Sequence, residues 1–182
     1  NGTLYPGPST VTIGGVPFLL SRGPTAGSSA WVVGGLASSG VARTYNLTGL
    51  DVADAVAMYA IVNSAFGACG TSVGSLTART ASGNAAFGLT VGVNVRDHFA
   101  GSFCNLQTQA VATGLYGGGT VRFDVYRFDL AARTANGSLP ISGITFATLG
   151  AGAGGEPFLA GLTFETLSRS VPEPATGALL GL

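Results

Sequence analysis

Short apolar runs, and stretches in which apolar and polar residues alternate, follow one another at close spacing along most of the chain. Alternation with a period of two is the pattern of a strand with one buried face, and the glycine and serine clusters between the runs are typical of turns. Gly14-Gly15 and Ser82-Gly83-Asn84 predict two such turns, each between neighbouring strands. The segments expected as strands are 11–13, 16–20, 31–33, 41–47, 76–80, 85–95, 121–130, 141–149 and 158–164.

Residues 121–130 show the clearest alternation, but its apolar phase changes by one residue in the middle. Apolar side chains stand at positions 121, 123 and 125, and then at positions 126, 128 and 130. Because side chains alternate strictly along a strand, this change predicts a β-bulge near Val125-Tyr126.

Residues 50–66 fit two secondary structures. Val52, Val56 and Tyr59 would form a helical stripe, whereas 57–62 is also typical of a buried strand. We favour a strand over 58–62, followed by a turn or a short helix before Gly67.

The whole pattern predicts an all-β chain that folds as a single antiparallel β-sandwich or jelly roll of about nine to eleven short strands. The sandwich is expected over residues 13–168. An extended N-terminal arm would precede it at 1–12, and a C-terminal tail would follow it at 169–182.

Composition supports a packed chain rather than a disordered one. Glycine supplies 30 of the 182 residues, only 9% are charged, and the mean hydropathy is +0.46. No apolar run reaches the length of about 18 residues that a membrane span needs. All eight basic residues are arginine and eight acidic residues balance them. Zero net charge without a basic cluster argues against nucleic-acid binding, and it favours association with other protein chains.

The C-terminal residues carry a short motif, Val171-Pro172-Glu173-Pro174, followed by an apolar stretch. The two prolines force an extended segment, and Thr176 can cap a helix that starts beyond it. The motif closely resembles the PEP-CTERM sorting signal, in which Val-Pro-Glu-Pro precedes a membrane helix and an arginine cluster. That resemblance implies export, recognition by an exosortase-type membrane protease, and a destination at the bacterial cell surface or in the extracellular matrix. Most of that helix and the arginine cluster are not in this sequence, so membrane contact is expected only transiently, during sorting.

Residues 13–18, 59–67 and 93–98 carry a second resemblance, which the 121–130 strand extends. These segments look like parts of a galactose-binding-like sandwich found in other PEP-CTERM proteins. The resemblance implies glycan binding at loops.

Cys69 and Cys104 form an even pair in a chain that is expected to be exported, so a disulfide between them is predicted. In the chain-entropy account such a bond stabilises by about 3–4 kcal/mol. Two free thiols or a bond between chains are the alternatives.

Asn94, Arg96, Asp97 and His98 form the densest polar cluster. On a strand, Asn94, Arg96 and His98 would share one face and Asp97 would lie on the other. One interpretation is a sugar-binding edge, in which arginine and asparagine donate to hydroxyls beside a neighbouring phenylalanine. The other, which we favour, is an Arg-Asp ion pair that closes a strand end, with His98 at a turn.

Catalytic and metal-binding patterns are weak. The chain has no Gly-x-Ser-x-Gly elbow, its acidic residues are scattered, and one histidine with two cysteines makes no zinc set. The glycine runs at 117–119 and 151–155 are followed neither by lysine nor by a helical pattern, so turns are expected there. We therefore expect no enzyme activity, no metal and no cofactor.

The expected function is that of a non-enzymatic extracellular structural protein, a self-assembling subunit of a fibre, sheath or exopolysaccharide-associated matrix. Zero net charge and the absence of lysine, which commonly guards strand edges, favour it. The alternative is a carbohydrate-binding module that tethers exopolysaccharide to the cell surface through the cluster around Arg96. The expected partners are other copies of the chain, exopolysaccharide and, during sorting, an exosortase.

Overall fold

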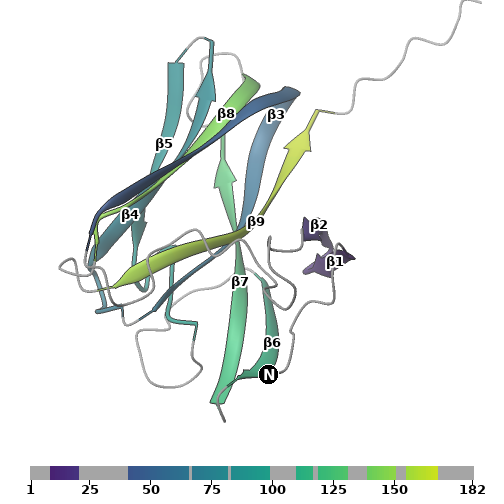
Figure 1. Ribbon diagram of the computed structural model, residues 1–182. Helices are drawn as coiled ribbons and strands as arrows, with labels where there is room; N and C mark the ends of the chain where they lie inside the picture. The colour runs from purple at the N-terminus through teal and green to yellow at the C-terminus, as the bar shows by residue number, and fades with distance from the viewer. Residues whose placement is uncertain are drawn as a thin grey trace, which may run out of the picture.

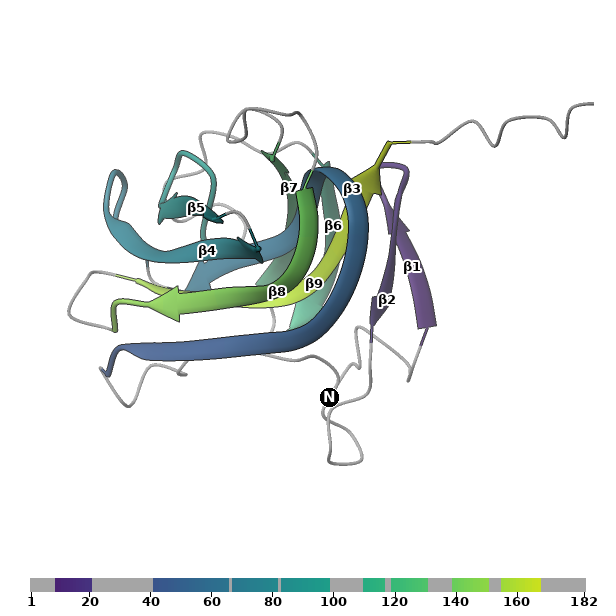
Figure 2. The same ribbon diagram turned by 90° about the horizontal axis from the view of Figure 1, so that it is seen from above.

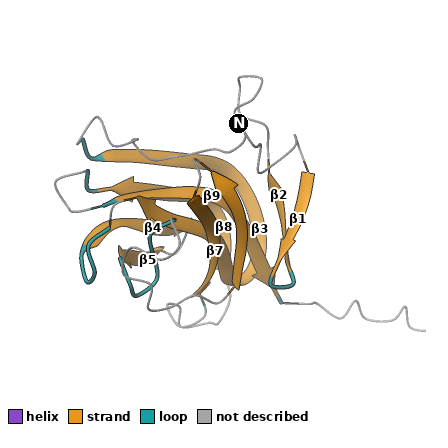
Figure 3. Cartoon of the chain, turned by 90° about the horizontal axis from the view of Figure 1, so that it is seen from below, coloured by secondary structure: helices purple, strands orange, loops and turns teal. Residues whose placement is uncertain are grey.

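Every regular element that the computed structural model describes is a β-strand (Figure 3). The described residues are 9–20, 41–65, 67–81, 83–98, 110–116, 119–130, 139–150 and 155–167. All pairings between these strands are antiparallel, which confirms the predicted fold class. The strands are β1 (Ser9–Ile13), β2 (Val16–Leu20), β3 (Arg43–Ala65), β4 (Ser72–Thr80), β5 (Gly83–Thr90), β6 (Ala110–Tyr116), β7 (Gly119–Asp129), β8 (Leu139–Thr148) and β9 (Glu156–Thr166).

The 23-residue strand β3 joins the two halves of the main sheet, whose strand order is β5-β4-β8-β3-β7-β6. Its first half pairs with β8, and its second half pairs with β7 on one edge and with β9 on the other. Between the halves β3 bends, and the sheet curls over into two layers (Figures 1 and 2). The pairing register shifts there, and Gly49 and Asp54 have φ of 75° and 54°. A backbone in this left-handed region interrupts a regular strand.

The main core lies between the two layers. Leu76, Phe87 and Phe146 come from the layer of β5, β4 and β8, and all three are buried. Met58 and Phe128 come from the opposite layer, and the rings of Phe87 and Phe128 are 5.1 Å apart. Burying these large side chains on both sides supplies most of the apolar contact that holds the layers together.

The β1–β2 hairpin covers the outer face of the second layer and makes a smaller core. Ile13 and Phe18 are buried there against Ile61 and Val125. Gly14 and Gly15 form the connecting turn with φ of 59° and 83°, as the sequence predicted for this site. Residues 9–12 belong to β1, so the inner end of the segment expected as an extended arm pairs with β2, and residues 1–8 lie outside the described residues.

The bulge predicted near Val125-Tyr126 is also wrong. β7 pairs with β3 and β6 without a register shift. Phe123 and Val125 pack beneath the hairpin, whereas Tyr126 and Phe128 face the main core. The change of apolar phase therefore marks a strand whose two faces meet two different cores.

Strand β9 contains an irregularity that the sequence did not reveal. Ile61 pairs with Gly161 and Val62 pairs with Leu159, so the strand is out of step at Ala160. Leu159 and Leu162 pack on the main core, while Ala160 faces the hairpin core. The single apolar face expected over 158–164 is thus divided between the two faces of the sheet.

Further expectations are corrected or lie outside the described residues. Residues 50–65 are strand throughout, which excludes the helical stripe and extends the strand expected over 58–62. A turn or a short helix was expected before Gly67, but residues 63–65 are strand and residue 66 lies outside the described residues. The hairpin of β4 and β5 is confirmed, but β5 ends at Thr90 rather than at residue 95. The strand expected at 31–33 and the tail at 169–182, with its Val171-Pro172-Glu173-Pro174 motif, lie outside the described residues.

Candidate functional site

Residues 96–98, the centre of the predicted polar cluster, bridge the end of β3 and the start of β7. Ser64 N donates to Arg96 O at 2.9 Å, and His98 N donates to Ser64 O at 2.9 Å. On the other side, Arg122 N donates to His98 O at 2.8 Å. Residues 96–98 therefore continue the sheet as a short bridge. The bonds are made by backbone groups, so they do not depend on which side chains stand at these positions.

Asn94 lies apart from this bridge and closes a turn. Its Oδ1 accepts from Thr90 N at 2.9 Å, and its Nδ2 donates to Gly88 O at 2.8 Å. Such local bonds between an asparagine side chain and the backbone are typical of tight turns. Asn94 therefore has a structural contact of its own and is not grouped with Arg96.

Arg96 forms a two-pronged ion pair with Asp124 of β7. Arg96 Nε lies 2.9 Å from Asp124 Oδ2, and a terminal nitrogen lies 2.6 Å from Oδ1. Asn63 adds a second pair of bonds: its Nδ2 donates to Asp124 Oδ2 at 2.5 Å, and its Oδ1 accepts from Asp124 N at 2.9 Å. The Asp124 side chain is 0% exposed, so its carboxylate is held entirely by protein groups.

Arg122 completes the cluster from the same face of β7 as Asp124. Its Nε and a terminal nitrogen donate to the backbone oxygen of Asp97 at 3.0 and 2.7 Å. Its Nε also lies 3.6 Å from Asp124 Oδ2. The bonds from Arg122 thus reach the Asp97 main chain, and the partner of Arg96 is Asp124 rather than the neighbouring Asp97.

The charges within the cluster influence one another. The hydrogen bond that Arg96 donates to Asp124 raises the pKa of Arg96 above its usual value. Burial lowers the pKa of Arg122, and the nearby charge of Arg96 lowers it further. Burial, with the negative charge of Asp124, raises the pKa of Tyr126 to about 12. Two guanidinium groups thus lie near two buried carboxylates: Asp124 acts on both arginines, and Asp97 adds a second negative charge near Arg122.

His98 lies at the half-exposed margin of this cluster. Its Nδ1 is 3.2 Å from Ser64 O, and its ring makes an edge contact with Phe158 at 5.5 Å. The Nδ1 atom is 3.9 Å from Asp97 Oδ1. The ring thus contacts a main-chain oxygen, a carboxylate and an aromatic side chain. Such contacts are typical of a histidine that packs within the fold.

The structure brings three of the four predicted site residues together: Arg96, Asp97 and His98. It adds partners that the sequence reasoning missed: Asn63, Ser64, Arg122 and Asp124. One signal was available, because Arg122 and Asp124 share the phase of Tyr126 and Phe128, which face the main core. Charged residues in the buried phase of a strand indicate an internal ion pair.

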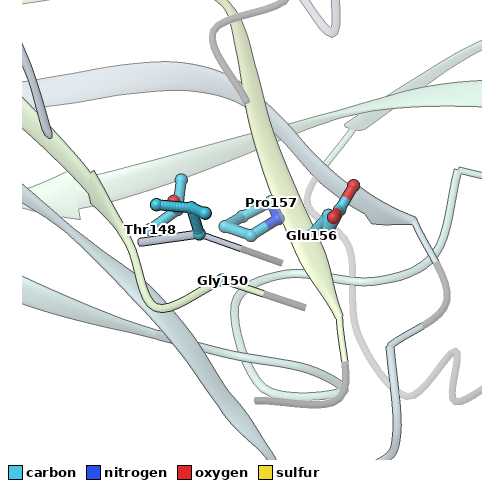
Figure 4. A pocket seen from close by; sticks show the side chains of 5 residues that line it. Thr148, Gly150, Glu156 and Pro157 are labelled. Carbon is cyan, nitrogen blue, oxygen red and sulfur yellow. The ribbon is translucent and has the colours of Figure 1, made fainter. Parts of the chain in front are cut away.

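A small open hollow lies where β8 ends and β9 begins. It is lined by Val41, Thr148, Gly150, Glu156 and Pro157. Figure 4 shows Pro157 on the side of Thr148, whereas the Glu156 carboxylate points away from both. Glu156 is 8% exposed, and its Oε2 has no hydrogen-bond partner among the described residues. The hollow itself therefore offers few polar groups to a ligand.

The first half of β3 has one unpaired edge within the described part of the chain. Ala55 pairs with Leu139 of β8 and with Thr166 of β9 at once, so β8 and β9 lie on opposite edges. The last bond on the β9 side joins Leu167 N to Asp54 O at 2.9 Å. From residue 43 to residue 53, the edge opposite β8 carries no described strand, and Figure 2 shows β3 as the outermost labelled strand of its layer.

Cys69 takes part in a disulfide and lies exposed just before β4. Cys104, its predicted partner, lies outside the described residues, so the pairing itself stays a prediction. Nowhere in the described ranges do three His, Cys, Asp or Glu side chains gather closely enough to hold a metal ion. A helix able to cross a membrane is likewise not found in those ranges.

Comparison with known proteins finds no matching family model, no matching curated protein and no matching solved structure.

Proposed function

We propose that this chain is a non-enzymatic structural protein of the bacterial cell surface or extracellular matrix, which associates with further copies of itself. The observation that carries the proposal is the edge of β3 opposite β8 over residues 43–53, which no described strand covers and which we call the open edge. An unpaired strand edge presents a row of backbone donors and acceptors to other chains. The surface location rests on the Val171-Pro172-Glu173-Pro174 motif.

The composition of this edge supports association. Residues 43–53 contain neither lysine nor proline, the residues that usually prevent edge pairing. Leu47, half-way along, is 49% exposed. Arg43 and Asp51 are the only charged residues in the segment, and their charges cancel.

The polar cluster supports a structural role rather than a reactive one. Asp124 binds Arg96 and Asn63, and Arg122 donates to the Asp97 backbone oxygen. The hydrogen bonds of these groups therefore stabilise the fold. A catalytic site needs groups that converge on a place where a substrate can sit. Here the convergent groups contact one another within the sheet.

The carbohydrate-binding alternative receives no support from the cluster on which it depended. The Arg96 side chain is 11% exposed, and two of its nitrogens donate hydrogen bonds to Asp124. Asp97 is buried, and Asn94 is occupied in a turn. A sugar hydroxyl would have to displace these bonds, which would leave buried charges unpaired.

The test is whether the purified chain associates reversibly as its concentration rises. Sedimentation velocity over a wide concentration range should show dimers or larger species, and electron microscopy should show ordered assemblies at the highest concentrations. Because the net charge is zero near pH 7, association should persist when the salt concentration is raised. A chain that stays monomeric up to its solubility limit contradicts the proposed function.

A further inference from the structure

We propose that the open edge of β3 pairs with the same edge of a second copy, antiparallel, around a twofold axis at Asn46. This inference rests on the proposed function, because it names the surface through which two copies associate. Pairing of a strand with its own copy is isologous, so it satisfies both edges and closes as a dimer. Four observations on residues 43–51 support it.

The first observation is the direction of the backbone groups. Arg43 N donates to Thr148 Oγ1 of β8 at 3.1 Å. Leu47 O accepts from the Arg79 side chain at 3.2 Å, and Arg79 reaches it from β4, across β8. Both groups therefore point toward β8. Because backbone groups alternate along a strand, those of Thr44, Asn46 and Thr48 point to the open edge.

The second observation is the register that these outward groups allow. With the axis at Asn46, each Thr44 lies opposite Thr48 of the second copy, and the two Asn46 residues face each other. All three positions become hydrogen-bonded pairs, and each such pair exchanges two bonds, giving about six in total. Gly49, with φ of 75°, ends the regular strand directly after this stretch. The paired segment is then Thr44 to Thr48 of each copy, about 17 Å long.

The third observation concerns the apolar side chains of the edge. Tyr45 packs on Phe146 with ring centroids 6.5 Å apart, so it points to the core side of the sheet. Leu47 lies on the same side of the strand and is 49% exposed. In the proposed register, Leu47 lies opposite Tyr45 of the second copy in a non-hydrogen-bonded pair, where side chains approach most closely. The pairing therefore covers the exposed leucine.

The fourth observation is charge. Arg43 and Asp51 are both exposed and stand near opposite ends of the open edge. An antiparallel pairing brings Arg43 to the end that holds Asp51 of the second copy, so opposite charges are neighbours. A parallel pairing would place like charges together, which is unfavourable. The charges thus favour the antiparallel orientation.

A cysteine at the axis tests the register directly. In a hydrogen-bonded antiparallel pair the Cα atoms are about 5.5 Å apart, which is within the range of a disulfide. Asn46→Cys should therefore form a disulfide-linked dimer under mild oxidation, with residue 46 of both chains in one cross-linked peptide by mass spectrometry. The matched control is Thr77→Cys, on the same outer face but in β4, which is flanked by β5 and β8. It should form no disulfide-linked dimer.

A charge variant provides a second readout that needs no cross-linking. Leu47→Lys should lower the association constant at least tenfold in sedimentation velocity, because it sets a charge opposite Tyr45 of the second copy. Val93 is 55% exposed in the turn after β5, so Val93→Lys is a matched control that should leave association unchanged. Urea unfolding should show that both variants remain folded.

The outcomes separate this inference from the proposed function. A wild-type chain that never associates overturns both. A chain that associates, yet neither cross-links at residue 46 nor responds to Leu47→Lys, overturns only the edge pairing. An Asn46→Cys variant whose introduced thiol is shielded from alkylating reagents in the monomer also overturns it, because the chain's own residues would then cover the edge.

Discussion

Replacing Asp124 by asparagine tests the role of the buried polar cluster. The substitution keeps the shape of the side chain but removes its charge, and so it leaves the guanidinium groups of Arg96 and Arg122 without their shared carboxylate. Removing one partner of a buried ion pair costs about 3–5 kcal/mol. Since domains of this kind are stable by about 5–15 kcal/mol, Asp124→Asn should remove about a fifth of the stability or more.

The assay is urea unfolding followed by tryptophan fluorescence and circular dichroism. The midpoint should fall while the slope m stays near that of the wild type, which indicates that the same surface unfolds. Asp129→Asn is the matched control on the same strand: its carboxylate lies 3.6 Å from Arg127, and the side chains of Asp129 and Arg127 are 52% and 33% exposed. Exposed pairs contribute about 0–1 kcal/mol, so this variant should be nearly neutral.

A double-mutant cycle with Arg96→Met isolates the pair itself. Because Arg96 and Asp124 share two short hydrogen bonds, the coupling energy should be about 2 kcal/mol or more. Arg122 remains close to the site in the double mutant, so the stability should be restored only in part. A cost of less than about 1 kcal/mol for Asp124→Asn, no larger than that of an exposed pair, would refute the reasoning.

Three further predictions concern stability in the same assay. The pKa of Tyr126 is raised from 10.0 to about 12, so the unfolded chain loses this proton first. Stability should therefore fall by about 2 kcal/mol between those pH values, and Tyr126→Phe should remove that loss. Gly74→Ala should destabilise by about 2–3 kcal/mol, because its Cβ would clash with the Ala147 backbone oxygen, whereas Gly88→Ala has open space and should gain up to about 1 kcal/mol. Glu156→Met should stabilise by about 1–2 kcal/mol, because a buried carboxylate oxygen without a partner is removed; an unchanged midpoint would contradict this.

The sequence predicted the fold class and several strands because these depend on local patterns. Gly14-Gly15 marks a turn wherever it stands between two apolar runs, and the β1–β2 hairpin follows from it. The alternation in 121–130 located β7 correctly. What the pattern did not reveal was that both faces of β7 are covered, because the covering hairpin is about a hundred residues away in the chain.

The same limit explains the errors at the polar cluster. The sequence predicts an ion pair between Arg96 and its neighbour Asp97, but Arg96 pairs with Asp124, 28 residues away. Only the sheet brings those two side chains to one place. The length of β3 was underestimated for a similar reason, because its pairing changes from β8 to β7 and β9 along its course, and its burial pattern changes with it.

The central position of β3 also has a consequence for how the chain reaches its native state. The nearest of the strands that pair with β3 begins at Gly119, and the others begin at Leu139 and Glu156. Contacts this distant in sequence form slowly, because a long loop must close before any bond is gained. Because the chain is synthesised from its N-terminus, β3 is made before the strands that pair with it. Until they are made, both edges of β3 and its apolar residues stay uncovered. A dependence on chaperones during synthesis is the expected result, and a chain that ends before β8 should not reach the native fold, because it lacks both β8 and β9, which pair with β3.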